Sequence, residues 1–376
     1  MARIPTAPGR RGPPLELIVV VLGIALALAA CGTGSSSGPP QAVGSIASSS
    51  AAVLPAPVAT AAPKVPAPPV AAPSAAALPT ASPPTAVPPV AASSAPGRAR
   101  VARSPIQLPF ARSRAVALVF GSTILVCGGF TGSGTTGSIT RIDVSTGQVA
   151  GDGNLKAAVH DAGGAVLGGS GFVFGGGRLA PGSVVQRVGP TGTAVLVGRL
   201  PAVRADLVAV AVGSQLVVVG GGTAAGPDAR VLATTDGKTF RVVGKLLVGV
   251  RYPAVAVVGG IVYVVGGSTA RGDTTAIQAV DPRTGVVRLI GHLPRALSHA
   301  SALVIGGSIV IAGGRTSGRA QDGVRRLDPA TGIVTSIGRL PYAVSDVAAV
   351  VVGGTGYLIG GERNRPLASI ITVAIQ

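Results

Sequence analysis

A Gly-Gly pair closes an apolar run six times between residue 120 and the C-terminus. The pairs begin at regular steps of 45 to 47 residues, at Gly128, Gly175, Gly220, Gly266, Gly313 and Gly360. A second set of positions, four of them followed by proline, keeps the same steps: Leu108, Leu155, Leu200, Leu246, Leu293 and Leu340. Two marks in phase over six units establish an internal repeat, and its period is typical of propellers and solenoids.

Each unit is predicted to contain four short strands, which we call a to d. In the fifth unit, residues 298–307 and 308–314 form two β-prone runs joined by a Gly turn, which indicates a hairpin of strands a and b. A polar loop and strand c follow. The sequence Asp328-Pro329-Ala330-Thr331-Gly332 then predicts a tight turn into strand d, with glycine supplying the positive φ.

This turn occurs in five units, whereas the Gly pair occurs in six, so the last unit lacks strand d before the chain ends at Gln376. Residues 104–109 precede the first strand a and match residues 336–341 in pattern. We therefore predict that residues 104–108 supply the missing strand. A ring closed in this way leaves no open junction between its ends. The predicted fold is an all-β, six-bladed propeller over residues 104–376.

The N-terminus has the form of an export signal. Arg3, Arg10 and Arg11 precede an apolar run over residues 17–30, which fits a secretory signal and is short for a membrane-spanning helix. The run ends in Leu28-Ala29-Ala30-Cys31, which resembles a bacterial lipobox. The resemblance implies that residues 1–30 are removed and that Cys31 is lipidated, which would anchor the protein on the extracytoplasmic face of the cell membrane. An ordinary signal peptide and an uncleaved signal anchor remain alternatives.

Residues 31–103 consist of alanine and serine runs broken by proline clusters. They have almost no large side chains, so burial cannot offset the entropy of ordering them. We predict a disordered tether between the anchor and the propeller.

The formal net charge is +18, with 27 Arg against 4 Lys. The arginines are scattered rather than gathered on a helix or interleaved with aromatics, and the leader indicates export, so we predict no nucleic-acid partner. Cys127 is the one cysteine besides Cys31, so the folded part has no internal disulfide. It lies in an apolar strand and is predicted to be a small buried hydrophobe.

Four-stranded units of this length, with Gly-Gly after strand b and Asp-Pro-x-Thr-Gly turns, resemble kelch repeats over residues 104–376. One departure is the lack of Trp and the scarcity of Tyr, because kelch units usually place aromatics between blades. Val, Leu and Ile must fill that space here. The kelch-like class includes copper radical oxidases resembling galactose oxidase, and sialic-acid epimerases. A carbohydrate-active enzyme of either type is therefore the alternative function.

In a propeller, strand a lines the central channel, and the d–a and b–c loops share one face. Counting five residues past each repeat proline position predicts the start of every strand a and a polar rim at the channel mouth: Arg114, Asp161, Asp206, Tyr252, His299 and Asp346. The b–c loops add further candidate ligand-binding residues on that face: Arg178, Arg271, Arg315, Arg319, Glu362, Arg363 and Arg365. Concave mouths with converging polar groups are the default binding site. Alternatively, these residues only solvate the channel and cap unpaired backbone groups.

Catalytic and metal-binding motifs are not evident. A copper site would need at least two His and a Tyr together, but His160 and His299 fall on units two and five, and His292 ends a strand d. We therefore predict a monomeric binding module without cofactor or metal, which recognises a protein or glycan of the cell envelope.

Overall fold

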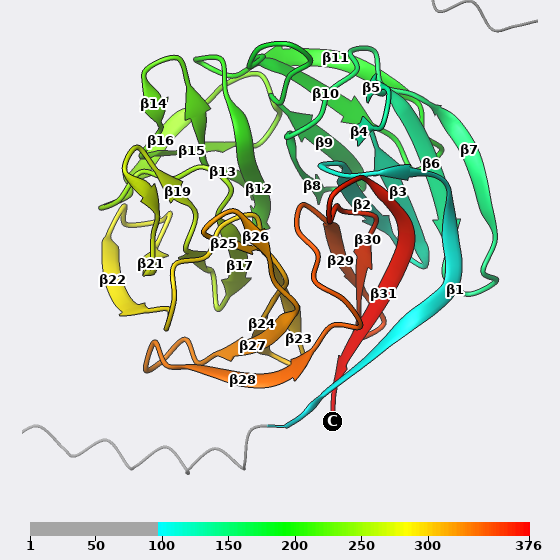
Figure 1. Ribbon diagram of the computed structural model, residues 1–376. Helices are drawn as coiled ribbons and strands as arrows, with labels where there is room; N and C mark the ends of the chain where they lie inside the picture. The colour runs from blue at the N-terminus through cyan, green and yellow to red at the C-terminus, as the bar shows by residue number, and fades with distance from the viewer. Residues whose placement is uncertain (1–96) are drawn as a thin grey trace, which may run out of the picture. The chain divides into compact units, whose positions relative to one another are not determined.

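Six four-stranded antiparallel sheets make up the structure, a computed structural model that describes residues 97–376 (Figure 1). Blade 1 is β2 (Val116–Phe120), β3 (Thr123–Cys127), β6 (Ser138–Asp143) and β7 (Val149–Asn154). Blade 2 is β8 (Gly163–Leu167), β9 (Ser170–Phe174), β10 (Val184–Val188) and β11 (Ala194–Arg199). Blade 3 is β12 (Ala205–Val212), β13 (Gln215–Thr223), β15 (Arg230–Thr234) and β16 (Arg241–Lys245).

Blade 4 is β17 (Ala254–Val258), β18 (Ile261–Val265), β21 (Ala276–Val280) and β22 (Val287–His292). Blade 5 is β23 (Ser301–Ile305), β24 (Ser308–Ala312), β27 (Gly323–Leu327) and β28 (Val334–Arg339). Blade 6 is β29 (Ala348–Val352), β30 (Thr355–Ile359), β31 (Leu367–Ile375) and β1 (Ala99–Arg112). Short strands in the b–c loops are β4 (Phe130–Thr131), β5 (Gly134–Thr135), β14 (Gly226–Pro227), β19 (Ser268–Thr269), β20 (Gly272–Asp273), β25 (Arg315–Thr316) and β26 (Arg319–Ala320).

The N-terminal strand closes the ring, as predicted. β1 pairs antiparallel with β31, so the first strand described becomes strand d of the last blade (Figure 1). Its pairing starts at Ala99, opposite Ile375, ahead of the predicted residue 104. The innermost strands β2, β8, β12, β17, β23 and β29 contact their neighbours in closed order. The predicted six-bladed propeller is therefore confirmed.

The Gly pairs join each blade to the next. The second glycine of every pair donates its N–H to a carbonyl in the following d–a segment, as Gly267 does to Leu297 O at 2.8 Å and Gly361 does to Arg112 O at 3.0 Å. The first glycine has positive φ, and a Cβ there would lie only 2.1 to 2.7 Å from the same carbonyl oxygen. Only glycine permits this approach, which explains why the pair recurs in all six units.

Aliphatic side chains fill the space between blades. One cluster between blades 3 and 4 is built mainly from valines, including Val219, Val231 and Val264, all fully buried. The cluster between blades 2 and 3 is the aromatic exception, with Phe172 and Phe174 buried and Phe240 packed against them. Cys127 is buried beside Leu125 and Ile139, as predicted, and burial raises the pKa of its thiol to about 12. Packing by Val, Leu and Ile thus replaces the aromatics of typical kelch units.

The predicted c–d turns are present in five blades. Gly147, Gly192, Gly237, Gly285 and Gly332 all adopt positive φ there. In three of these turns the glycine N–H bonds to the carbonyl of the Asp that starts the turn, as from Gly332 to Asp328 at 2.8 Å. These turns lie at the opposite end of the strands from the b–c loops.

The predicted lipidation site Cys31, the predicted leader and most of the predicted tether lie outside the described residues. No helix within residues 97–376 has the length and hydropathy needed to cross a membrane.

Candidate functional site

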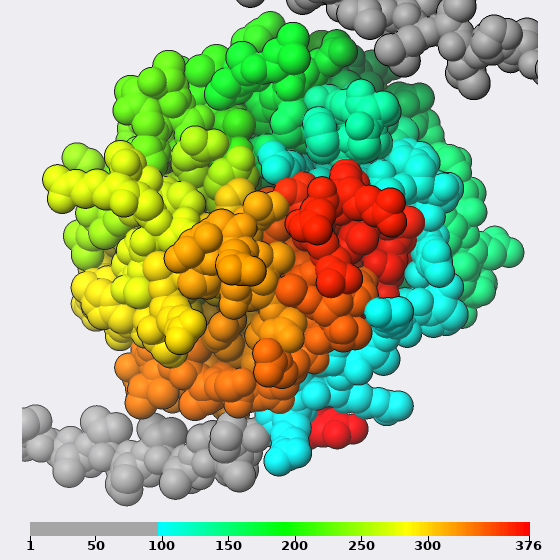
Figure 2. All heavy atoms as spheres, in the orientation of Figure 1, coloured from blue at the N-terminus to red at the C-terminus, as the bar shows by residue number. Residues whose placement is uncertain are grey.

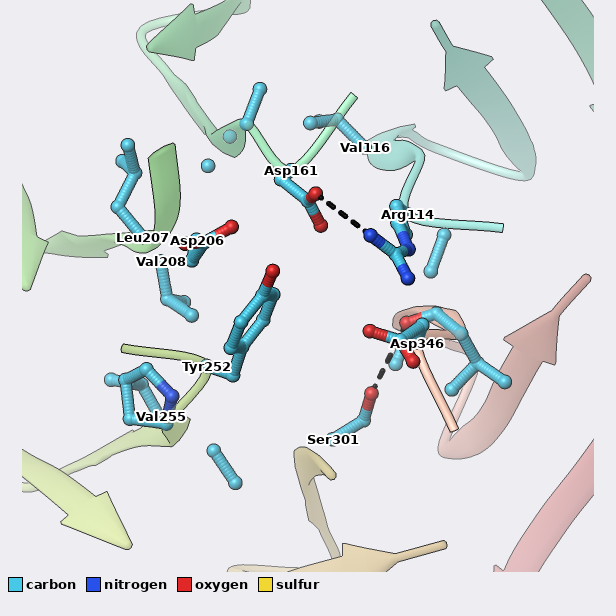
Figure 3. Close-up of a pocket in the computed structure, with 18 of the residues that line it drawn as sticks. Arg114, Val116, Asp161, Asp206, Leu207, Val208, Tyr252, Val255, Ser301 and Asp346 are labelled. Carbon is cyan, nitrogen blue, oxygen red and sulfur yellow. Dashed lines mark hydrogen bonds and ion pairs between the residues drawn. The ribbon is translucent and has the colours of Figure 1, made fainter. Parts of the chain in front are cut away.

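The six residues predicted to rim the channel form a ring at its mouth (Figure 3). All have left-handed φ between 49° and 62°, although none is glycine. We expected them to begin the innermost strands. That is wrong for five blades, in which the strand starts two residues later, since left-handed φ interrupts the regular strand conformation there. In blade 3 the strand starts at Ala205.

Backbone hydrogen bonds link these residues into a closed circle, which we call the mouth ring. Each N–H donates to the carbonyl of the equivalent residue one blade earlier, at 2.8 to 3.1 Å, and Arg114 N–H completes the circle by donating to Asp346 O. The left-handed conformation turns each N–H toward the preceding blade, so every backbone group of the ring is satisfied. The side chains are thereby held around the channel axis.

A cavity of about 270 Å³ lies at the mouth ring. Its rim is polar and is made by the ring side chains. Its deeper walls, which we call the throat, are strand residues with small or apolar side chains, among them Ala117, Gly164, Ala209, Ala302 and Ala349. The site therefore combines a charged entrance with an apolar interior.

In one half of the rim, the acidic and basic side chains form ion pairs with one another. Glu362 receives Arg114 Nη2 at 3.2 Å and Ser113 Oγ at 2.9 Å, and it also pairs with Arg315. Asp346 receives His299 Nδ1 at 2.6 Å and Ser345 Oγ at 2.7 Å. Arg315 Nε lies 3.4 Å from the same carboxylate.

The other half of the rim carries Asp161, Asp206 and Tyr252. Arg114 Nη1 reaches Asp161 Oδ2 at 3.3 Å, as Figure 3 shows, and Arg251 Nε reaches Asp206 Oδ2 at 2.6 Å. The Tyr252 ring stacks on the His299 ring with 3.6 Å between centroids. The two carboxylates and the phenol hydroxyl point toward one another (Figure 3).

The carboxyl groups of the two halves differ in pKa. Burial, together with the nearby charges of Asp206 and Asp346, raises the pKa of Asp161 to about 7 despite the opposing charge of Arg114. Burial also acts to raise the pKa of Asp346, but the hydrogen bonds from His299 and Ser345 outweigh it, so that pKa lies below its ordinary value. Sequence reasoning found no partner able to perturb Asp161, because Arg114 and Asp206 come from other units.

The Asp161 titration gives a testable pH dependence. Because its folded pKa lies above the ordinary carboxyl value of about 3.9, the folded state holds this proton more tightly than the unfolded state does. Its contribution to stability is full below about pH 4 and is lost as the pH rises to about 7. We expect the Asp161 carboxyl carbon to titrate by NMR with a midpoint near 7, and Asp161→Asn to reduce the fall in urea stability over this range. A midpoint below pH 5 would contradict this assignment.

The structure divides the predicted loop residues into two groups. Arg315 and Glu362 join the mouth network. The arginines of the second group are exposed, and among residues 97–376 none forms an ion pair: Arg178, Arg271, Arg319, Arg363 and Arg365. We call these five the arginine crown. In Figure 2 the loops of blades 5 and 6, orange and red, lie side by side on this face.

Two buried arginines were not identified from the sequence. Arg112 and Arg204 are each 1% exposed. They occupy a column of the repeat that holds Val159, Val250, Leu297 and Val344 in the other units. Aligning the units by this column would have revealed both.

The histidines lie apart from one another. His160 Nδ1 shares a hydrogen bond of 2.8 Å with Thr135 Oγ1, whereas His299 is engaged with Asp346 on blade 6. Within residues 97–376 there is no group of three or more His, Cys, Asp or Glu side chains arranged to hold a metal ion.

Comparison with known proteins supports the fold. The family model described as Kelch motif matches residues 296–341, which include blade 5. The solved structure of YjhT aligns with 72% of this chain and 97% of that chain, at a TM-score of 0.62 and 14% identity. It is one of 898 solved chains that match, so the likeness shows the fold and not a function. No curated protein matches the chain significantly. The match of a Kelch motif over residues 296–341 and the six-bladed fold agree with the predicted resemblance to kelch repeats.

Proposed function

We propose that the protein is an exported, lipid-anchored binding module that recognises an anionic protein or glycan of the cell envelope through its b–c loop face. The arginine crown is the observation that carries this proposal. Its arginines are exposed and come from the b–c loops of four of the six blades. A kelch-type propeller is also a fold suited to protein binding.

Charge complementarity supports an anionic partner. Glu362 and Asp346 at the channel mouth are already engaged within the protein, by Arg114, Arg315 and His299. The crown guanidiniums are not neutralised in this way. Guanidinium binds carboxylate and phosphate through paired hydrogen bonds, so an unpaired set on one face favours partners that carry these groups.

Exposed apolar side chains on the same face favour an acidic protein over a glycan. Leu179 follows Arg178 in the loop of blade 2 and is fully exposed, and Val203 and Leu247 in neighbouring d–a loops are 42% and 61% exposed. Arginine combined with apolar anchors is the composition typical of protein interfaces. The lipobox-like Leu28 to Cys31 and the long tether are the basis for placing the module outside the membrane.

Charge reversal in the crown tests this proposal. We expect the double variant Arg271→Glu and Arg363→Glu of the full-length chain to bind poly-L-glutamate at least about tenfold more weakly, because two attractive charges become repulsive. Arg283→Glu is the matched control, since Arg283 is an exposed arginine in a c–d turn on the opposite face. Equal binding by wild type and the crown variant would refute the proposal. Substituting polygalacturonate for poly-L-glutamate distinguishes a glycan from a protein partner.

One observation favours the alternative of a carbohydrate-active enzyme. The His299–Asp346 pair and Asp161, whose pKa is about 7, border a single cavity. A general acid–base catalyst works best with a pKa near the working pH. Turnover of a sugar that Asp161→Asn abolishes would establish this alternative.

A further inference from the structure

We propose that the channel mouth is a separate binding site for a small primary amine, with the ammonium group held by Asp161, Asp206 and Tyr252 and the apolar part in the throat. This inference does not depend on the arginine crown. It rests on free acceptor atoms, on the balance of charge at the rim, and on the polarity of the cavity.

The free acceptors are carboxylate oxygens. Arg114 and His160 both approach Oδ2 of Asp161, and Arg251 contacts Oδ2 of Asp206. The hydrogen bonds to these two carboxylates within residues 97–376 involve Oδ2 and leave Oδ1 of each without a bonded donor, although the Tyr252 hydroxyl lies close to the Asp206 carboxylate. The two side chains are only 9% and 5% exposed. Neither Oδ1 is among the fully enclosed polar atoms that lack a partner, so each is open to the cavity. Acceptors that face a cavity and have no protein donor are available to a ligand that donates hydrogen bonds.

The two acceptors are close together because of the mouth ring. Asp206 N–H bonds directly to Asp161 O at 2.8 Å, and Tyr252 N–H bonds to Asp206 O at 2.9 Å. Asp161, Asp206 and Tyr252 are therefore consecutive members of the mouth ring, and their side chains point toward one another (Figure 3). They present two carboxylate oxygens and one phenol oxygen, which matches the three N–H donors of a primary ammonium group.

The balance of charge favours a cation over a neutral donor. The rim contains four carboxylates, Asp161, Asp206, Asp346 and Glu362, against three guanidiniums, Arg114, Arg251 and Arg315. An ammonium group would balance these charges, whereas a hydroxyl would leave the excess in place. The repulsion by Asp206 and Asp346, which adds to burial in raising the pKa of Asp161, would also be relieved.

The cavity favours a small amine with a short apolar chain. Polar groups lie at the rim, whereas the throat is lined by alanine, glycine and valine. The short alkyl chain of such an amine would be transferred from water into the apolar throat, while the ammonium group remained at the rim. A charged side chain of a docking protein would enter the cavity from the loop face with its charged end first. Its charge would then lie in the apolar throat and not at the polar rim.

Binding of an amine should depend on pH in a defined direction. The groups that face Asp161 are Arg114, His160, Asp206, Tyr252 and Asp346. Burial, followed by the charge of Arg114, lowers the pKa of His160, so His160 is neutral near pH 7. Asp161, with a pKa of about 7, titrates between pH 6 and 8, and an ammonium ligand requires it ionised. Affinity should therefore rise with pH over this range, with release of a proton on binding.

Calorimetric titration of the full-length protein with n-butylamine tests the proposal. We expect a Kd on the order of 1 mM at pH 8 and weaker binding at pH 6. Tetramethylammonium, which lacks N–H donors, and n-butanol, which lacks charge, should each bind at least tenfold more weakly. Methylamine should also bind more weakly, because it leaves the throat empty. Binding of n-butanol as tight as that of n-butylamine would overturn the ammonium assignment.

Variants identify the site. Asp206→Asn should weaken n-butylamine binding at least tenfold, and Tyr252→Phe should weaken it by a smaller factor while disturbing the ring less. The double crown variant, Arg271→Glu with Arg363→Glu, is the control and should bind n-butylamine like wild type. Unchanged amine binding by both Asp206→Asn and Tyr252→Phe would refute the site. Loss of poly-L-glutamate binding together with normal amine binding would show that the two surfaces act independently.

Discussion

Gly266→Ala is expected to destabilise the propeller by about 2–5 kcal/mol. Gly266 has a φ of +61°, and a Cβ there would lie 2.1 Å from the Leu297 carbonyl oxygen. Left-handed φ costs a non-glycine residue about 1–2 kcal/mol, and forcing packed atoms apart costs about 1–3 kcal/mol more. The added methyl would also push apart the hydrogen bond between Gly267 N–H and Leu297 O that joins blade 4 to blade 5.

Gly260→Ala separates the two contributions. Gly260 has a φ of +78° in the turn between strands a and b of the same blade, but a Cβ there would meet nothing within 4 Å. Only the conformational cost of about 1–2 kcal/mol should remain. Urea unfolding of both variants, with comparable m-values, measures the difference. Equal losses for Gly260→Ala and Gly266→Ala would mean that contact with the next blade is not what requires the Gly pair.

The repeat made the architecture predictable because its marks correspond to contacts that every blade must make. Gly-Gly recurs since each blade approaches the next through the same backbone hydrogen bond. The closing strand was predictable for the same reason, as residues 104–108 keep the pattern of strand d. Its extension to Ala99 was not predictable, because those residues pair with β31 without carrying any mark of the repeat.

The candidate site was predictable in position but not in chemistry. Counting along the repeat identified the mouth ring, since a propeller places equivalent residues around one axis. It did not reveal the left-handed φ of Tyr252 or His299, which is unusual for such side chains. Nor did it reveal that Arg315 pairs with Glu362 while Asp161 Oδ1 stays free. Those outcomes depend on side-chain reach across blades, which a linear spacing does not encode.

Arg112 and Arg204 are buried exceptions in a column of the repeat that is otherwise valine or leucine. Arg204 pairs with the buried Asp228, and Arg204 Nη1 donates to Gly220 O and Arg230 O, both at 3.2 Å. Arg112 occupies the equivalent position between blades 6 and 1, two junctions earlier, where Thr136 replaces the aspartate. Its guanidinium instead bonds to Ser138 Oγ at 3.2 Å and Thr140 Oγ1 at 2.8 Å. Burial lowers the pKa of Arg112 to about 10, so it remains charged at neutral pH.

Asp228→Ala is accordingly expected to destabilise the protein by about 3–5 kcal/mol, the usual cost of leaving one member of a buried ion pair alone. Blade 3 cannot compensate as blade 1 does, because Arg230 and Leu232 stand where Ser138 and Thr140 supply hydroxyl groups. The side chain of Arg204 would retain only two carbonyl acceptors and would lie beside a second cation, Arg230. Urea unfolding at pH 7 measures the loss.

The neighbouring blade provides the control. The equivalent pair in blade 4 is Val250 with Thr274, and Thr274 N–H bonds to Gly267 O as Asp228 N–H bonds to Gly221 O. Transferring this pair by Arg204→Val with Asp228→Thr removes both charges together, so we expect stability near that of wild type even though Asp228→Ala alone is strongly destabilising. A double variant as unstable as Asp228→Ala would show that the loss comes from the backbone around Asp228. Recovery in the double variant would show that the cost is the uncompensated charge of Arg204.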